Sequence, residues 1–330
     1  FANCYGLPQP HLRQVLVGPP GMQDESTLDV EVALQVAPDL DSLDLYSYNG
    51  GGFSQVIPPE WWIEMMALPV TPSVYGATPP DVVSVSYGAC EVDWASNTPL
   101  VTMIDRMTSL AVTTGMSFFV SSGDSGSTGC LPNPELAIQY PSASPWVTAV
   151  GGTGWTLNQD NTIAAEAAWN DTLFAPPYGR TDGSGGGGTS RLIARPVWQS
   201  GDGVPAGAMR LTPDVSMFAD FLPGVATSRG AVAGTSAASP MAAGIWALMT
   251  QLARASGRSV PGFAAPLLYA LGRSSSPALR DVTAANNDIL NAGCCDATPA
   301  WDLATGCGSL RGQELAQALS GRLGWTSRSR

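Results

Sequence analysis

Two carboxyl side chains, Glu25 and Asp29, lie four residues apart in the stretch QDESTLDVEVALQVAP (23–38). This stretch is predicted to be helical, so both carboxyls lie on one helical face. Two close carboxyl groups share a proton, with one pKa raised and the other lowered. Such a pair can take a proton from a hydroxyl and return it to a leaving amine, but only in acid, because a carboxylate is a weak base near neutrality. The alternative is a solvated acidic first turn, which also suits the helix dipole.

A hydroxyl that such a pair could serve is Ser236, in VAGTSAASPMAAGIWALMTQLA (232–253). Ser236 opens a run of strong helix formers, and Pro240 is expected in the first turn, where it removes no intrahelical hydrogen bond. A serine at the head of a helix is most often an N-cap. The same position also offers free backbone N–H groups and the positive end of the helix dipole, which can stabilise a tetrahedral oxyanion.

A second serine stands in SSGDSGSTGC (121–130), whose Gly-Asp-Ser-Gly run is the one in which chymotrypsin-type enzymes carry their nucleophile. Ser125 would need a histidine base to act in that way. The single histidine, His11, lies in LPQPHLRQ near the N-terminus and is expected to be an exposed loop residue. A histidine-dependent mechanism, whether of chymotrypsin or subtilisin type, is therefore set aside.

The excess of acidic residues argues against some classes of binding partner. Among 330 residues, 27 are acidic and 15 are basic, all of them arginine, which gives a net charge of −12 at pH 7. Nucleic acid and anionic membranes are poor partners for such a surface. At about pH 3 to 4 most of these carboxylates would be protonated and their repulsion would fade, which suits an acidic medium. No apolar run reaches the ~18–20 residues that span a bilayer, and no signal-peptide pattern is visible.

The cysteines form an even set without the spacing of a zinc site, which predicts disulfides in an oxidising compartment. They are Cys4, Cys90, Cys130, Cys294, Cys295 and Cys307.

Short β-rich runs alternate with helical stretches along the chain. Strands are expected over 13–18, 43–48, 81–88, 116–123 and 146–152, and helices over 24–37, 59–67, 100–115 and 236–254. Near-continuous apolar strands separated by helices indicate a mostly parallel sheet covered on both faces, in one domain over 1–330. Active sites of such sheets lie at the carboxyl ends of strands, where Asp124 is expected. The glycine-rich stretch 179–190 lacks the ending of a P-loop and is expected to be a flexible surface loop.

Three of these stretches together resemble the sedolisins, the serine-carboxyl peptidases, which share the subtilisin fold and include the tripeptidyl peptidases. GTSAASP (234–240) is similar to the family's nucleophile motif and implies that Ser236 is the nucleophile. ESTLD (25–29) resembles the Glu-x-x-x-Asp helix, with Glu25 as general base and Asp29 orienting it. SSGDSG (121–126) resembles the motif whose aspartate donates to the oxyanion, which implies that role for Asp124 and none for Ser125. A carboxyl can donate only when protonated, so such an enzyme should work in acid.

The resemblance extends to substrate binding and to a disulfide. SVSYG (84–88) is similar to the family's substrate strand, so the backbone of Ser86, Tyr87 and Gly88 is expected to pair with an extended peptide. Cys90 and Cys130 follow neighbouring strands and could be bridged, but some relatives tie the Cys130 position to the calcium loop, so this pairing stays open.

The resemblance also implies one bound calcium ion in the stretch 280–309. Asp281 and Asp302 would supply carboxylates, and Val282, Thr298 and Ala300 would supply backbone carbonyls, a set of oxygen ligands that suits calcium. Relatives typically carry glycine at the positions of Thr298 and Ala300, where the loop bends sharply. The alternative is an Asn/Asp-rich loop closed by a disulfide from Cys294 or Cys295 to Cys307.

The family's catalytic domains begin with an earlier strand that lies in the middle of the sheet. This chain is therefore expected to lack that first strand, and the prosegment of the family, so both would be partners from outside residues 1–330. The resemblance implies a peptidase of peptides or denatured proteins, acting through an acyl-enzyme on Ser236, secreted or resident in an acidic compartment such as the lysosome. Whether it is an endopeptidase or a tripeptidyl peptidase stays open. The alternative is a catalytically silent peptide-binding relative or an inactive fragment.

Overall fold

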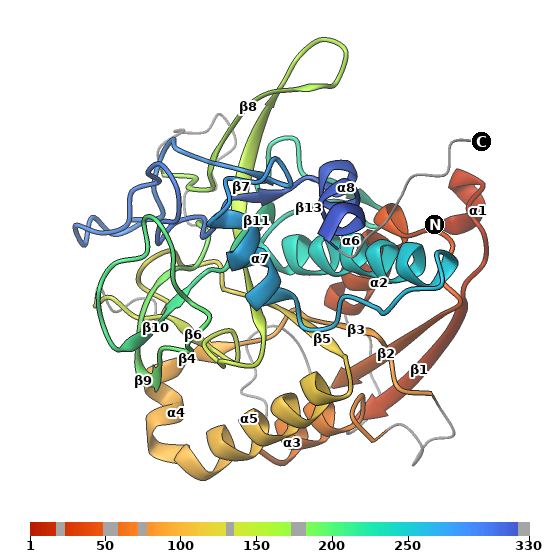
Figure 1. Ribbon diagram of the computed structural model, residues 1–330, viewed down its shortest axis with the longest axis horizontal. Helices are drawn as coiled ribbons and strands as arrows, with labels where there is room; N and C mark the ends of the chain where they lie inside the picture. Colours follow the sequence, from red (N-terminus) through yellow and green to blue (C-terminus); the bar gives the residue numbers. More distant parts are fainter. Residues whose placement is uncertain (18–23, 49–58, 72–77, 130–134, 173–182, 323–330) are drawn as a thin grey trace.

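A computed structural model of the chain describes residues 1–17, 24–48, 59–71, 78–129, 135–172 and 183–322 (Figure 1). Its main sheet has the strand order β14-β15-β11-β7-β5-β3, with β8 paired to β7. The four pairings from β15 to β3 are parallel, whereas β14 and β8 run antiparallel to their neighbours. These strands are β3 (Val82–Val85), β5 (Ser117–Ser121), β7 (Thr148–Leu157), β8 (Ile163–Ala168), β11 (Val215–Phe218), β14 (Leu279–Arg280) and β15 (Ser309–Leu310).

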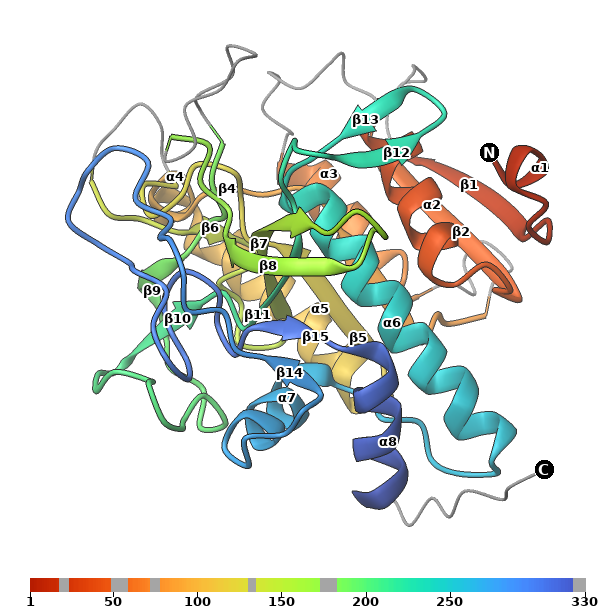
Figure 2. The ribbon, with the colours of Figure 1, turned by 90° about the horizontal axis from the view of Figure 1, so that it is seen from above.

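Helices cover both faces of this sheet. Adjacent residues of a strand point to opposite faces, and β5 shows both. Phe118 packs with α3 (Pro59–Ala67) and α5 (Thr98–Thr113), whereas Phe119 packs with α6 (Thr235–Ala255), α7 (Ala264–Gly272) and α8 (Gly312–Arg322). Both phenylalanines are fully buried. The three-layer α/β architecture expected from the sequence is confirmed (Figure 2).

A second, two-stranded parallel sheet consists of β1 (His11–Val17) and β2 (Ser42–Tyr48). Among the described residues, β2 has no strand partner besides β1, and β3 has none besides β5. A cleft of about 730 Å³ separates β2 from β3, with α2 (Asp24–Val36) and α6 along its walls. A sheet that lacks one strand between β2 and β3 would present such a cleft, and its lining reaches Asp29 and Ser86.

The predicted elements agree with the observed ones to within a few residues, except that β3 ends at Val85 rather than at 88 and β7 continues to Leu157 rather than ending at 152. The helices α7 and α8 and the strands β8, β11, β14 and β15 were not predicted, and neither were the smaller elements. The smaller elements are α1 (Ala2–Tyr5), β4 (Ala89–Cys90), α4 (Glu91–Trp94), a 3₁₀ turn (Ala95–Asn97), β6 (Gln139–Tyr140), β9 (Gly188–Ala194), β10 (Met209–Thr212), β12 (Val225–Thr227) and β13 (Gly230–Val232). None of the described helices has the length and apolarity needed to cross a membrane.

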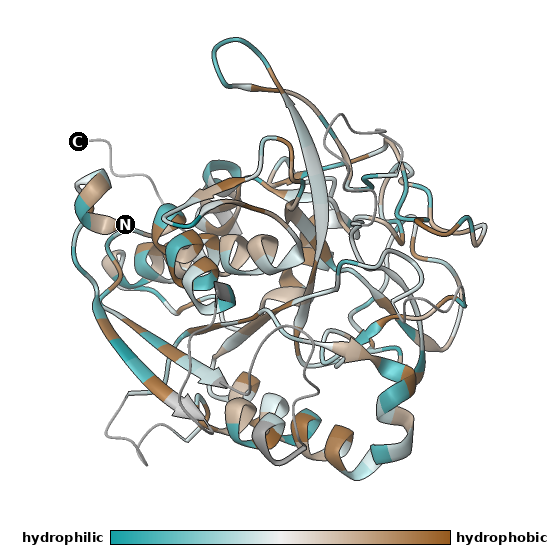
Figure 3. Ribbon diagram, turned by 180° about the vertical axis from the view of Figure 1, so that it is seen from behind, coloured by the Kyte–Doolittle hydropathy of each residue, from teal (hydrophilic) through white to brown (hydrophobic). Residues whose placement is uncertain are grey.

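The hairpin of β7 and β8 projects from the body of the molecule. Figure 3 shows that its tip is hydrophilic, whereas the strand segments below it are less so. At the base of the hairpin, Glu166 accepts hydrogen bonds from Thr153, Trp155 and Ser309, which ties both strands to β15. The hairpin therefore extends outward from an anchored, partly buried base.

The cysteines only partly follow the expectation of an all-disulfide set. Cys294 and Cys295, adjacent in sequence, are bonded to each other, whereas Cys4 and Cys307 are free thiols. The alternative in which Cys307 closes the loop to either of them is therefore wrong. Cys90 is disulfide-bonded, but Cys130 lies outside the described residues, so the pairing of these two stays a prediction.

Candidate active site

Ser236 is the second residue of α6, which begins at Thr235. The N-cap alternative is wrong, because the cap position is Gly234, whose φ of 103° favours glycine. Pro240 is the sixth helical residue rather than part of the first turn, so its missing N–H leaves the Ser236 carbonyl without its helical partner. The Ser86 hydroxyl, 3.2 Å away, donates to this carbonyl instead.

Glu25 lies in the first turn of α2, which packs against α6. Only 7% of its surface is exposed, and one of its oxygens has no hydrogen-bond partner. Burial raises the pKa of Glu25 to about 7, a hydrogen bond with the Ser236 side chain lowers it, and the charge of Asp124 raises it. The Ser236 hydroxyl also lies 3.4 Å from the Ser86 carbonyl, a long contact. The alternative of a solvated acidic turn is therefore wrong for Glu25.

Asp29 lies one turn further along α2. Burial raises the pKa of this carboxyl well above its ordinary value, and the negative charge of Glu25 raises it further. A hydrogen bond of 2.5 Å from the Ser86 hydroxyl acts in the opposite direction. The expectation that one of the two pKa values is lowered is wrong, because burial raises the pKa of both carboxyls, and the charge of Glu25 further opposes the ionisation of Asp29.

Asp124 follows β5, at the carboxyl end of a central strand as predicted. Its Oδ1 accepts hydrogen bonds from the Thr235 backbone N–H at 2.7 Å and from the Thr235 hydroxyl at 2.8 Å. The side chain is exposed by its accessible surface, yet protein atoms crowd it enough that desolvation raises its pKa against those two bonds. A Cβ at Gly234 would lie 2.7 Å from Asp124 Oδ2, so glycine allows this close approach.

The glycine-rich stretch braces the turn that carries Asp124. Its described part, from 183 onward, begins with buried residues, so the expectation of a flexible surface loop is wrong there, and 179–182 lie outside the described residues. The Gly186 N–H donates to the Gly123 carbonyl at 2.7 Å, and the Ser184 N–H donates to the Asp124 carbonyl at 3.1 Å. A Cβ on Gly186 would lie 2.2 Å from the Ser122 carbonyl oxygen, so this contact requires glycine.

The predicted substrate-binding residues, Ser86, Tyr87 and Gly88, follow the end of β3 and lie beside the carboxyl pair. Burial, followed by the charges of Glu25 and Asp29, raises the pKa of Tyr87. Sequence reasoning found this segment but missed that the Ser86 side chain reaches Asp29, because no motif reports where a side chain points. It also missed Thr235, whose contact with Asp124 depends on two segments 111 residues apart.

Ser125 and His11 take no part in this cluster. The Ser125 carbonyl accepts a hydrogen bond from the Thr128 hydroxyl within the same turn. His11 is exposed at the first position of β1 rather than in a loop.

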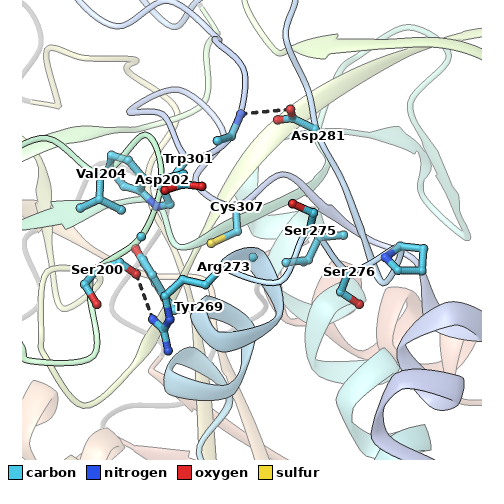
Figure 4. Close-up of a pocket in the computed structure, with 15 residues that line it drawn as sticks. Ser200, Asp202, Val204, Tyr269, Arg273, Ser275, Ser276, Asp281, Trp301 and Cys307 are labelled. Carbon is cyan, nitrogen blue, oxygen red and sulfur yellow. Dashed lines mark hydrogen bonds between the residues drawn. The ribbon is translucent and has the colours of Figure 1, made fainter. Parts of the chain in front are cut away.

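The expected calcium ligands come from two segments, 281–282 and 298–302, which hydrogen bonds bring together, and Figure 4 labels Asp281 of the first segment. Asp281 accepts a hydrogen bond from the Ala300 N–H at 3.0 Å, and Asp302 accepts one from the Thr298 N–H at 3.0 Å. Ala300 has a φ of 69°, which explains why glycine suits this position. The donors are all hard oxygens, which fit calcium, although the described residues contain no cluster of three or more His, Cys, Asp or Glu side chains.

Figure 4 also shows the pocket beside this loop, about 260 Å³ in volume. It is lined by Arg273, Asp281, Trp301 and Cys307 among others. The candidate catalytic residues Glu25, Asp29, Asp124 and Ser236 do not line it. The candidate calcium loop and the candidate catalytic cluster are therefore separate sites.

Comparisons with known proteins agree with this geometry. The model of the subtilase family matches residues 39–261. Kumamolisin of Bacillus sp. (strain MN-32) is 34% identical over 314 residues, which are 91% of this chain and 51% of that protein. Sedolisin of Pseudomonas sp. (strain 101) is 34% identical over 250 residues, 69% of this chain and 39% of that protein. The chain thus spans about half, or less, of the length of these relatives.

Among solved structures, one described as Pseudomonas sedolisin (serine-carboxyl proteinase) complexed with two molecules of pseudo-iodotyrostatin superimposes with a TM-score of 0.81 at 26% identity. The match covers 97% of this chain and 87% of that one. The subtilase match, the 34% identity to kumamolisin over nearly the whole chain and this shared fold show that the chain belongs to the sedolisin family.

Proposed function

We propose that the chain is the catalytic part of a serine-carboxyl peptidase that cleaves peptides or denatured proteins in acid. The observation that carries the proposal is the meeting of Glu25, Asp29, Asp124 and Ser236, which come from α2, the end of β5 and the head of α6. A hydroxyl beside a desolvated carboxyl pair, with a third carboxyl at the same helix terminus, is suited to acyl transfer.

Each group has a distinct role in this mechanism. Ser236 Oγ attacks the scissile carbonyl carbon while Glu25 takes its proton, which gives a tetrahedral intermediate. Asp124, protonated, donates to the oxyanion. Glu25 then returns the proton to the leaving amine, the C–N bond breaks and an acyl-enzyme remains. A water molecule, deprotonated by Glu25, attacks the ester carbonyl. The bond to Ser236 Oγ then breaks, Glu25 returns the proton to Oγ, and the acid product leaves.

The two kinds of carboxyl need opposite protonation states, so the pH profile is bell-shaped. Glu25 must be ionised to act as base, and its pKa of about 7 moves the ascending limb toward the upper end of the acid range. Asp124 must hold a proton, and its raised pKa extends the range in which it does so. Activity fades on the alkaline side as Asp124 loses its proton.

The substrate would bind as an extended strand along the backbone of Ser86, Tyr87 and Gly88. The position of this segment supports such a binding mode. The Ser86 carbonyl lies 3.4 Å from the Ser236 hydroxyl, so a peptide paired with the segment would pass the nucleophile. The cleft between β2 and β3 suits a further strand, which a family prosegment or an additional N-terminal segment would supply.

A calcium ion would be held by the carboxylates of Asp281 and Asp302 and the carbonyls of Val282, Thr298 and Ala300. When bound, it would neutralise the two carboxylates and fix the loop that they share. Asp302 has a pKa raised to about 6 by burial, so calcium binding would weaken in acid as this carboxyl takes up a proton. We place the protein outside the cell or in an acidic compartment, in keeping with its charge of −12 and its disulfides.

The test is hydrolysis of a denatured protein from about pH 3 to about pH 8, with Ser236→Ala as the control. Activity confined to the acid side and lost in the alanine variant supports the proposal, whereas an optimum above neutrality would overturn the role of the carboxyl pair. A peptide aldehyde separates catalysis from mere peptide binding. The enzyme should hold it as a Ser236 hemiacetal, far more tightly than the corresponding plain peptide, and a silent binder should not distinguish the two.

A further inference from the structure

The Ser86 side chain occupies the junction between the base and the nucleophile. Its hydroxyl oxygen lies 2.5 Å from Asp29 Oδ1 and 3.2 Å from the Ser236 carbonyl oxygen. Only 9% of Ser86 is exposed, so water competes little for these contacts. One hydroxyl thus touches the helix that carries Glu25 and the helix that carries the nucleophile.

The contact with α6 exists because of Pro240. In a regular helix the N–H of residue 240 would donate to the Ser236 carbonyl, and proline has no N–H. A half-buried carbonyl without a donor is costly, and the Ser86 hydroxyl supplies one. The nucleophile's own peptide unit is therefore fixed from outside its helix.

A hydroxyl has a single proton, so Ser86 cannot donate to both oxygens at once. Both contacts are satisfied together when Asp29 is protonated and donates to Ser86 Oγ while Ser86 donates to the Ser236 carbonyl. Within the described ranges, the titratable groups that act electrostatically on these carboxyls or lie beside them are Glu25 on α2, Asp124 after β5 and Tyr87 next to Ser86. Because none of the three is a cation, a proton on Asp29 is favoured.

We propose that the Ser86 hydroxyl is a positioning residue that couples Asp29 to the Ser236 peptide unit, so that the base and the nucleophile keep their relative placement during acyl transfer. This inference rests on the proposed function. It goes beyond the backbone role expected for Ser86, because the side chain acts on the catalytic groups and not on the substrate.

The kinetic test compares Ser86→Ala, Ser86→Thr and Ser84→Ala. Ser84 is a matched control, because its hydroxyl points to the same face of the strand and contacts Ser239 of α6 at 3.0 Å, with no contact to a carboxyl. Ser86→Ala should lower kcat roughly tenfold to a hundredfold with KM nearly unchanged, since the backbone is intact. Ser86→Thr restores the hydroxyl and should recover most of kcat, whereas Ser84→Ala should have a much smaller effect.

A second arm does not depend on catalysis. The ¹³C chemical shift of the Asp29 carboxyl, assigned with Asp29→Asn, is followed against pH in the same variants. Because the Ser86 hydroxyl contacts this carboxyl directly, Ser86→Ala should displace the Asp29 titration, and Ser84→Ala should leave it in place.

An unchanged kcat or an unmoved Asp29 titration in Ser86→Ala would overturn the inference. If Ser236→Ala retains activity, or the parent protein has none, the proposed function fails, and the carboxyl titration still decides whether Ser86 is coupled to Asp29. The two failures are therefore distinguishable.

Discussion

Two buried carboxyl sites in this molecule differ in what surrounds them. Asp214, fully buried, accepts bonds from both terminal nitrogens of Arg210 at 2.7 and 2.6 Å, and further bonds from the Tyr269 hydroxyl at 3.0 Å and the Ala149 N–H at 2.7 Å. Glu25 is also buried and Asp29 is half-buried, but in the described part of the chain no arginine is bonded to them, and their contacts are hydroxyl groups.

The difference separates a structural carboxylate from the pair that we propose transfers protons. A buried carboxylate with a bidentate arginine stays charged and holds its surroundings together. A buried carboxyl without a cation holds its proton to higher pH and can exchange it with a neighbouring hydroxyl. The same residue types thus serve opposite purposes, according to the donors that the fold supplies.

The largest expected effect is on catalysis. Glu25→Gln keeps the shape of the side chain but removes the base, so kcat/KM should fall roughly a thousandfold or more. The control is Glu135→Gln, an exposed side chain that forms an ion pair with Arg191, and it should change kcat/KM little. Retention of a tenth of the activity in Glu25→Gln would contradict the assignment of Glu25 as base.

The next effect is on stability. Asp214→Asn removes the carboxylate and leaves the charge of Arg210 buried without its ion-pair partner, which should lower the free energy of unfolding by about 3–5 kcal/mol. The matched control is Asp81→Asn, whose partner Arg254 is exposed, with an expected change below about 1 kcal/mol. Guanidinium unfolding at one pH measures the free energy of unfolding of both variants. Equal decreases would show that burial does not determine how much an ion pair contributes to stability.

The ionised form of Glu25 should destabilise the fold, whereas the Asp214 carboxylate should stabilise it. The pKa of Glu25 is raised from 4.5 to about 7 in the folded state, so its contribution is fully present below 4.5 and is lost as the pH rises through 7. Stability should therefore fall across this window, on the order of 3 kcal/mol from this group. Glu25→Gln should flatten the curve and be more stable than the parent at pH 8. A parent protein that is most stable at pH 8 would contradict this sign.

The smallest effect concerns the calcium loop. Removing calcium with a chelator should lower Tm by a few degrees, in proportion to the ligand's binding free energy. Asp302→Asn should abolish that response. Asp288→Asn is the control, because Asp288 caps the neighbouring N–H groups of Ala292 and Gly293 without contacting Asp302. The proposed calcium site is wrong if Tm is the same with and without the ion in the parent protein.

Much of the local architecture was predictable from the sequence. The bounds of α2 and α6 follow from runs of helix formers, and Asp124 at the end of β5 follows from an apolar strand ended by glycine. The glycine-rich stretch was misjudged, because glycine content alone does not distinguish a mobile loop from a close approach of two backbones. At Gly186 two backbones approach closely, and this is seen only from the position of the Ser122 carbonyl in the folded structure.

The sequence by itself determined which residues can do chemistry: a pair of carboxyls on one helical face, a serine at the head of a helix and the absence of a usable histidine. Short-range spacing and residue type suffice for these, because a helix turn fixes which side chains lie together. Tertiary structure alone decided the surroundings of each group. The Ser86 hydroxyl on Asp29, the Thr235 N–H on Asp124 and the arginine on Asp214 join segments from different places in the chain, and burial with or without such donors sets which carboxyl keeps its proton.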